Sequence, residues 1–127
     1  LTALLAQAAE RALTTASAAA SPIWAGAQVH TGLIASGDRF VSSADDSSRL
    51  QAALQGAGHT ALAVEMEGAA VAQVSADYGV AFAAMRTISD RADDLAHLDF
   101  SSFVSAVASR YAQRIMVELL RSLPAPV

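Results

Sequence analysis

The fold is decided by the stretch Thr60-Ala-Leu-Ala-Val-Glu-Met-Glu67. Its first five residues form a short, almost wholly apolar run, which is typical of a β-strand buried on both faces. Three residues with long side chains follow at once, and a helical pattern then continues to about Tyr78, before a glycine at the usual helix C-terminal position. A buried strand that leads directly into a helix is the repeating unit of a parallel sheet, so this stretch predicts an α/β fold.

The same alternation of helix and strand extends on both sides of this stretch. Apolar periodicity, turn residues and capping residues define the remaining elements. We expect helices over residues 2–20, 45–55 and 100–123, and strands over residues 27–36 and 80–88. The strands contain few polar residues, which predicts a largely parallel sheet covered by helices on both faces, within one domain over residues 1–127.

Composition excludes several classes of protein. Hydrophobic residues make up 54% of the chain and charged residues 16%, which excludes a disordered tail and predicts a buried core. No apolar run approaches the roughly 18–20 residues that span a bilayer, so we expect no membrane partner. The net charge of -4, without a basic cluster, argues against a nucleic-acid partner.

The sequence also offers no pattern for a metal or a cofactor. It contains no cysteine, which excludes disulfides and cysteine-based metal sites and is compatible with the reducing cytoplasm, where we expect the protein to act. His30, His59 and His97 lack metal-ligand spacing with the carboxylates, and there is no glycine-rich phosphate loop. We therefore expect neither a metal nor a cofactor.

Polar residues stand at the carboxyl end of each of three predicted strands. The first strand runs into Ser36-Gly-Asp-Arg-Phe40, the second into Glu65-Met-Glu67, and the third, which contains Arg86, into Ser89-Asp90. Ligands of open α/β sheets bind outside the carboxyl ends of the strands. This placement predicts one small-molecule pocket, which is acidic and flanked by an aromatic ring. Phe40, Met66, Glu67 and Asp90 would surround it.

Three segments in this order resemble the later half of the nucleoside phosphorylase/nucleosidase family. They are Gly32-Leu-Ile-Ala-Ser-Gly-Asp-Arg-Phe40, Ala63-Val-Glu-Met-Glu-Gly-Ala-Ala70 and Arg86-Thr-Ile-Ser-Asp-Arg-Ala-Asp93. The methylthioadenosine/S-adenosylhomocysteine nucleosidase branch is the most similar. The resemblance runs from about Gly32 to the final helix, at roughly the spacing of the family.

The resemblance implies a three-layer α/β sandwich of the phosphorylase/nucleosidase type. Residues 1–127 would be the C-terminal part of one such domain, whose N-terminal half is absent from this sequence. The implied activity is hydrolysis of methylthioadenosine or S-adenosylhomocysteine to adenine and the thioribose, a reaction of methionine salvage. A homodimer is expected when the domain is complete.

The resemblance gives Asp90 the role of proton donor. Cleavage of the ribosyl bond pushes negative charge onto the purine, and a carboxylic acid at N7 neutralises that charge. General acid catalysis of this kind contributes roughly 10²–10⁴-fold to the rate. The alternative for Asp90 is a helix-capping or loop carboxylate.

The same resemblance assigns substrate contacts to further residues. Glu67 matches the ribose-binding glutamate, whose anion accepts hydrogen bonds from the 2′- and 3′-hydroxyls, although a carboxylate here also suits a helix N-terminus. Met66 would lie against the ribose, with core packing as the alternative. Phe40 would stack on the purine, and Val41 would offer its backbone N–H and C=O to the adenine edge.

Three residues support these contacts in the same interpretation. Ser89 would orient Asp90 or contact the base. Glu65 belongs with the substrate-binding motif, although we place its side chain behind the direct contacts. Arg86 lies in an apolar run and needs a carboxylate partner, for which Glu65 or Glu67 is a candidate.

Two alternatives to the hydrolase stay open at the level of sequence. The first is a purine nucleoside phosphorylase of the same family, because the phosphate-binding arginines lie largely in the absent half. The second is a truncated, non-catalytic nucleoside-binding or interaction module. The glutamate that activates water in the family also lies in that half, so we expect the 127 residues alone to be inactive.

Overall fold

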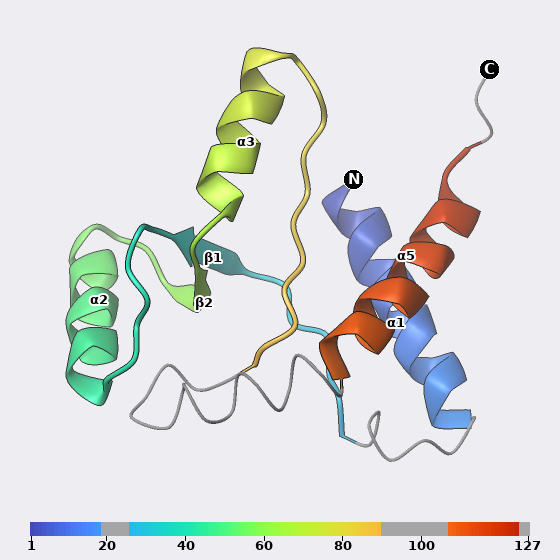
Figure 1. Ribbon diagram of the computed structural model, residues 1–127, viewed down its shortest axis with the longest axis horizontal. Coiled ribbons are helices and arrows are strands. Elements are labelled where there is room, and N and C mark those ends of the chain that lie inside the picture. The colour runs from blue at the N-terminus through green and yellow to red at the C-terminus, as the bar shows by residue number, and fades with distance from the viewer. Residues whose placement is uncertain (19–25, 90–106, 125–127) are drawn as a thin grey trace. The chain divides into compact units, whose positions relative to one another are not determined.

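The computed structural model describes residues 1–18, 26–89 and 107–124, which belong to two compact units (Figure 1). A helical unit comprises residues 1–31, 83–87 and 105–127, and a sheet unit comprises residues 32–82 and 88–104. Within the described ranges, no helix is both long enough and apolar enough to cross a membrane.

The helical unit is built on the packing of α1 (Thr2–Ala18) against α5 (Ser109–Ser122). Alanine makes up much of the buried stripe of α1, and small side chains allow two helices to approach closely. The buried core consists of Leu5, Ala8, Ala9, Ala12, Ile115 and Leu119. At the edge of this core, Arg11 donates a hydrogen bond to Ser122 and lies 3.9 Å from the carboxylate of Glu118.

Truncating Ile115 to alanine should destabilise the helical unit. Its side chain is 4% exposed, and removing it leaves a cavity that costs about 2–5 kcal/mol in typical cores. Because the core is small and partly open, we expect a loss near 2 kcal/mol in the free energy of unfolding. Chemical denaturation followed by circular dichroism measures it. Val117→Ala, on the same helix but 40% exposed, is the control, and equal losses in both variants would contradict the assigned core.

The sheet unit contains two parallel strands, β1 (Leu33–Ser36) and β2 (Ala61–Glu65), joined through α2 (Ala44–Gly56). From Ile34 onward, β1 pairs in register with β2, from Ile34 opposite Ala63 to Ser36 opposite Glu65. The amide of Gly37 extends this ladder by donating to the carbonyl of Glu65 at 3.1 Å. The helix α3 (Gly68–Asp77) follows β2. Both strands therefore end at the same edge of the sheet.

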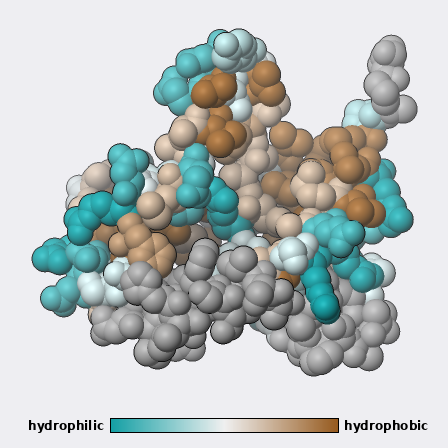
Figure 2. Space-filling view, viewed as in Figure 1, coloured by the Kyte–Doolittle hydropathy of each residue, from teal (hydrophilic) through white to brown (hydrophobic). Residues whose placement is uncertain are grey.

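The sheet unit lacks the buried core of the helical unit. Within its described residues, no hydrophobic side chain is fully buried. Val71 and Val74 on α3 are more than half exposed, and Figure 2 shows hydrophobic surface over this helix. The burial of both sheet faces, which the sequence predicts, is therefore not reached among the described residues.

Most predicted elements are confirmed, whereas the strands predicted over 27–36 and 80–88 need correction. The predicted parallel pairing is present between β1 and β2. The helices predicted over 2–20, over 45–55 and before Gly79 correspond to α1, α2 and α3. The strand predicted over 27–36 is shorter, because only Leu33–Ser36 is paired with β2. Of the helix predicted over 100–123, residues 109–122 are helical, and residues 100–106 lie outside the described ranges.

The strand predicted over residues 80–88 is wrong for this structure. No strand is assigned to residues 80–89. Apolar composition alone does not make a strand, because its N–H and C=O groups must pair with a neighbouring strand. Two apolar residues of this segment, Ala83 and Met85, nevertheless pack against the core of the helical unit.

Candidate functional site

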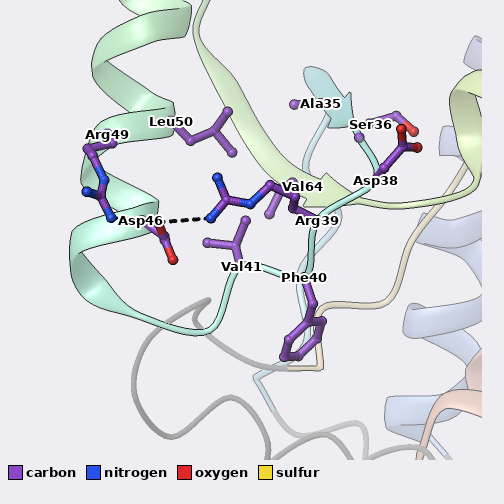
Figure 3. A pocket seen from close by; sticks show the side chains of 11 residues that line it. Ala35, Ser36, Asp38, Arg39, Phe40, Val41, Asp46, Arg49, Leu50 and Val64 are labelled. Carbon is purple, nitrogen blue, oxygen red and sulfur yellow. Dashed lines mark hydrogen bonds and ion pairs between the residues drawn. The ribbon is translucent and has the colours of Figure 1, made fainter.

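A hollow lies at the carboxyl end of β1 within the sheet unit (Figure 3). Its volume is about 370 Å³, which is in the range of small-molecule sites. The hollow is lined by the two strands, by the loop of residues 37–41 and by the first turns of α2. The strands contribute Ala35, Ser36 and Val64. Its position matches the rule that ligands of α/β sheets bind beyond the strand ends.

Phe40 and Val41, which the sequence places at the purine, both line this hollow. They belong to the loop between β1 and α2, and Phe40 is 42% exposed. In Figure 3 the ring points away from the side of the loop where Arg39 reaches α2. An exposed aromatic ring beside a hollow is available for stacking on a flat base.

A cluster of charges on the wall of the hollow was not foreseen from the sequence. Asp46, in the first turn of α2, accepts a hydrogen bond from Arg49 at 2.8 Å and lies 3.4 Å from Arg39. Ser43 caps the same helix, with its hydroxyl 3.2 Å from both the amide and the Oδ2 of Asp46. The spacing Asp46-x-x-Arg49 is a helical ion-pair signal that sequence reading could have used.

The partners of Asp46 keep its carboxylate ionised. The hydrogen bond from Arg49 is the largest cause that lowers the pKa of Asp46, and the hydrogen bond from Ser43 acts in the same direction. Partial desolvation opposes these effects, and the nearby charges of Arg39 and Arg49 add to the lowering. The cluster is therefore formed throughout the neutral pH range.

At the end of β2, Glu65 caps helix α3. Its carboxylate accepts hydrogen bonds from the amide of Gly68 at 2.7 and 2.9 Å and from the amide of Glu67 at 3.2 Å. A Cβ at position 68 would lie 2.6 Å from this carboxylate, so a larger residue there would make the Glu65 side chain shift from its capping position. Ser36, at the end of β1, accepts from the amide of Ala69 at 3.0 Å. Both strand ends are therefore tied to the first turn of α3.

Glu67 stands at the N-cap position of α3, but its side chain makes no capping hydrogen bond. The capping role that the sequence left open for Glu67 is taken by Glu65. Glu67 and Met66 are both exposed, at the carboxyl end of β2 and one strand away from the loop that carries Phe40. Their predicted ribose contacts stay a prediction, and neither residue lines the hollow itself.

The roles of the three remaining predicted residues stay predictions. Arg86 belongs to the helical unit, whereas Glu65 and Glu67 belong to the sheet unit, so their pairing stays a prediction. Ser89 belongs to the sheet unit, and Asp90 lies outside the described residues. Among the described residues, no group of three or more His, Asp or Glu side chains could hold a metal ion.

A family model described as the phosphorylase superfamily matches residues 1–121. The chain belongs to the phosphorylase superfamily. Two curated relatives are named 5′-methylthioadenosine/S-adenosylhomocysteine nucleosidase. The one from Haemophilus ducreyi is 38% identical over 95 residues, which cover 75% of this chain, and the one from Exiguobacterium sp. is 41% identical over 88 residues, which cover 69%.

Two solved structures have the same fold. An S-adenosylhomocysteine nucleosidase from Streptococcus pyogenes, in complex with 5-methylthiotubericidin, has a TM-score of 0.72 at 31% identity and covers 95% of this chain. A 5′-methylthioadenosine/S-adenosylhomocysteine nucleosidase from Neisseria meningitidis, in complex with methylthio-immucillin-A, also has a TM-score of 0.72, at 35% identity and 94% coverage. The fold of this chain is therefore that of the phosphorylase/nucleosidase type.

These likenesses cover only part of each relative. The chain spans 36–39% of the length of the two curated relatives and 45–46% of the two solved structures.

Proposed function

We propose that the natural protein containing this chain is a purine nucleoside N-ribosyl hydrolase that releases adenine from methylthioadenosine or S-adenosylhomocysteine. One observation carries the proposal: the strand ends with the family motifs lie side by side, beside a hollow with an exposed aromatic ring, in a chain similar to proteins named as these nucleosidases. The residues that hold base and ribose would come from this chain.

In the proposed reaction, the bond between C1′ of the ribose and N9 of the adenine breaks. Its electron pair goes to the purine, and Asp90 delivers a proton to N7, which neutralises the departing base. Water then attacks C1′ of the positively charged sugar and gives up one proton as the new C–O bond forms. The residue that activates this water is not assigned to any position of this chain.

The binding contacts of the proposal divide between two strand ends. After β1, Phe40 stacks on the adenine, and the backbone of Val41 bonds its edge. After β2, Glu67 accepts hydrogen bonds from the ribose hydroxyls and favours a cationic sugar, while Met66 lies against the ribose. Ser89 orients Asp90. The homodimer, the cytoplasmic location and the place in methionine salvage stay predictions.

A product assay tests this function directly. The natural protein is incubated with methylthioadenosine or S-adenosylhomocysteine, with and without inorganic phosphate, and released adenine and sugar are separated by chromatography. We expect free adenine and the unphosphorylated thioribose in phosphate-free buffer. Cleavage that requires phosphate would instead identify a phosphorylase, an activity that the description of the family model also fits. Binding without cleavage would identify a non-catalytic module.

A further inference from the structure

The loop that carries Phe40 and Val41 is closed by a single carboxylate. Arg39 lies directly before these two residues, and Ser43 lies two positions after them. Arg39 approaches Oδ1 of Asp46 to 3.4 Å, while Ser43 donates to Oδ2 at 3.2 Å. Both ends of the short segment are thereby attached to the same side chain, on the first turn of α2.

Arg49 holds this carboxylate from the other side. It donates to Oδ1 at 2.8 Å from one turn further along α2, so Oδ1 lies between two guanidinium groups. Ser43 in turn accepts from the amide of Asp46 at 3.2 Å, which fixes the start of the helix. The carboxylate therefore has partners on the loop, at the cap and on the helix.

We propose that Asp46 is a positioning residue, which closes the segment from Arg39 to Ser43 so that Phe40 and Val41 are held ready for the base. The inference rests on the proposed function, because it assigns the loop to the recognition of a purine. Asp46 would touch no substrate atom and would act only through the loop.

We call the bonds that join Asp46 to Arg39, Ser43 and Arg49 the clasp. The solvent exposure of the loop side chains explains why the clasp matters. Phe40 is 42% exposed, so its position depends in part on the loop that carries it. The Arg39 side chain is 83% exposed, so its single ion pair with Asp46 contributes little by itself. We expect the clasp to strengthen base binding because several bonds share one carboxylate and together fix the loop. A loop that is already fixed loses less conformational freedom when the base binds.

The chain offers a matched control for the clasp. Glu118 and Arg121 on α5 form an ion pair with the same helical spacing, at 2.9 Å, and the Arg121 side chain is 71% exposed. The corresponding values for Asp46 and Arg49 are 2.8 Å and 74%. Arg121→Gln removes one guanidinium group from an ion pair outside the loop, as Arg39→Gln removes one from the pair with Asp46, and therefore controls for the loss of a surface ion pair.

The experiment compares Asp46→Asn, Arg39→Gln and Arg121→Gln in the natural protein. Hydrogen exchange of the amides of residues 38–43 is followed by mass spectrometry, adenine affinity by calorimetry, and KM and kcat by the product assay. We expect faster exchange, adenine binding weakened roughly three- to tenfold and a raised KM with nearly constant kcat in the first two variants. Arg121→Gln should resemble the wild type in all four.

Unchanged exchange of the loop in Asp46→Asn and Arg39→Gln would overturn the clasp. Faster exchange with wild-type adenine affinity and KM would overturn its link to the base. Arg39→Gln guards against a general folding defect, because an 83% exposed side chain contributes little to the core. If the wild type neither binds adenine nor cleaves nucleosides, the proposed function fails, whereas the exchange data still decide whether Asp46 fixes the loop.

Discussion

Replacing Asp90 by Asn in the natural protein is expected to lower kcat for methylthioadenosine by roughly 10²–10⁴-fold, the usual contribution of a general acid. An amide cannot deliver a proton to N7, so the negative charge on the departing adenine is no longer neutralised. In the proposed function the contacts to base and ribose come from other residues, so nucleoside affinity should change much less than kcat.

Steady-state rates of adenine release, together with calorimetric binding of the substrate, check this expectation. Asp77→Asn is the control, since Asp77 ends α3, accepts a hydrogen bond from Gln73 on the same helix at 2.9 Å and does not line the hollow. Near-normal turnover of Asp90→Asn would remove Asp90 from the acid role. A parallel loss in Asp77→Asn would show that any lost carboxylate in this unit disturbs the enzyme.

Local patterns predicted the helices and the second paired strand well, whereas the first strand is shorter than predicted. The apolar run before Glu65 forms β2, and the helix that follows it ends at Asp77, just before Gly79 with its positive φ of 65°. These features depend on neighbours in the sequence: a glycine accepts the left-handed conformation at a helix end, and a short apolar run favours a strand.

The segment over 80–88 shows why the remainder of the sheet could not be predicted. Its apolar composition correctly indicated that some side chains are covered, since Met85 packs on the helical core. Composition does not state which strand lies beside it, however, and a strand is defined by the partner that shares its hydrogen bonds. The same limit applies to the clasp, because the approach of Arg39 to Asp46 depends on how the loop folds.

The same substitution at the two glutamates of the Glu65-Met-Glu67 motif should affect different properties, catalysis at Glu67 and stability at Glu65. Glu67→Gln removes the charge that is proposed to hold the ribose hydroxyls. Hydrogen bonds to a charged group contribute about 1.5–3 kcal/mol, so kcat/KM should fall by roughly 10- to 100-fold. Because its side chain makes no capping bond, we expect little change in stability.

Glu65→Gln should instead act on α3. The carboxylate that accepts from Gly68 and Glu67 loses its charge at a helix N-terminus, and the loss of such a cap costs about 0.5–2 kcal/mol. Thermal unfolding should therefore shift to lower temperature, whereas kcat/KM should fall less than in Glu67→Gln. Measuring both quantities for both variants separates the roles of the two residues. Equal losses of stability in the two variants would show that Glu67 also holds the helix, and equal losses of kcat/KM would place Glu65 among the direct ribose contacts.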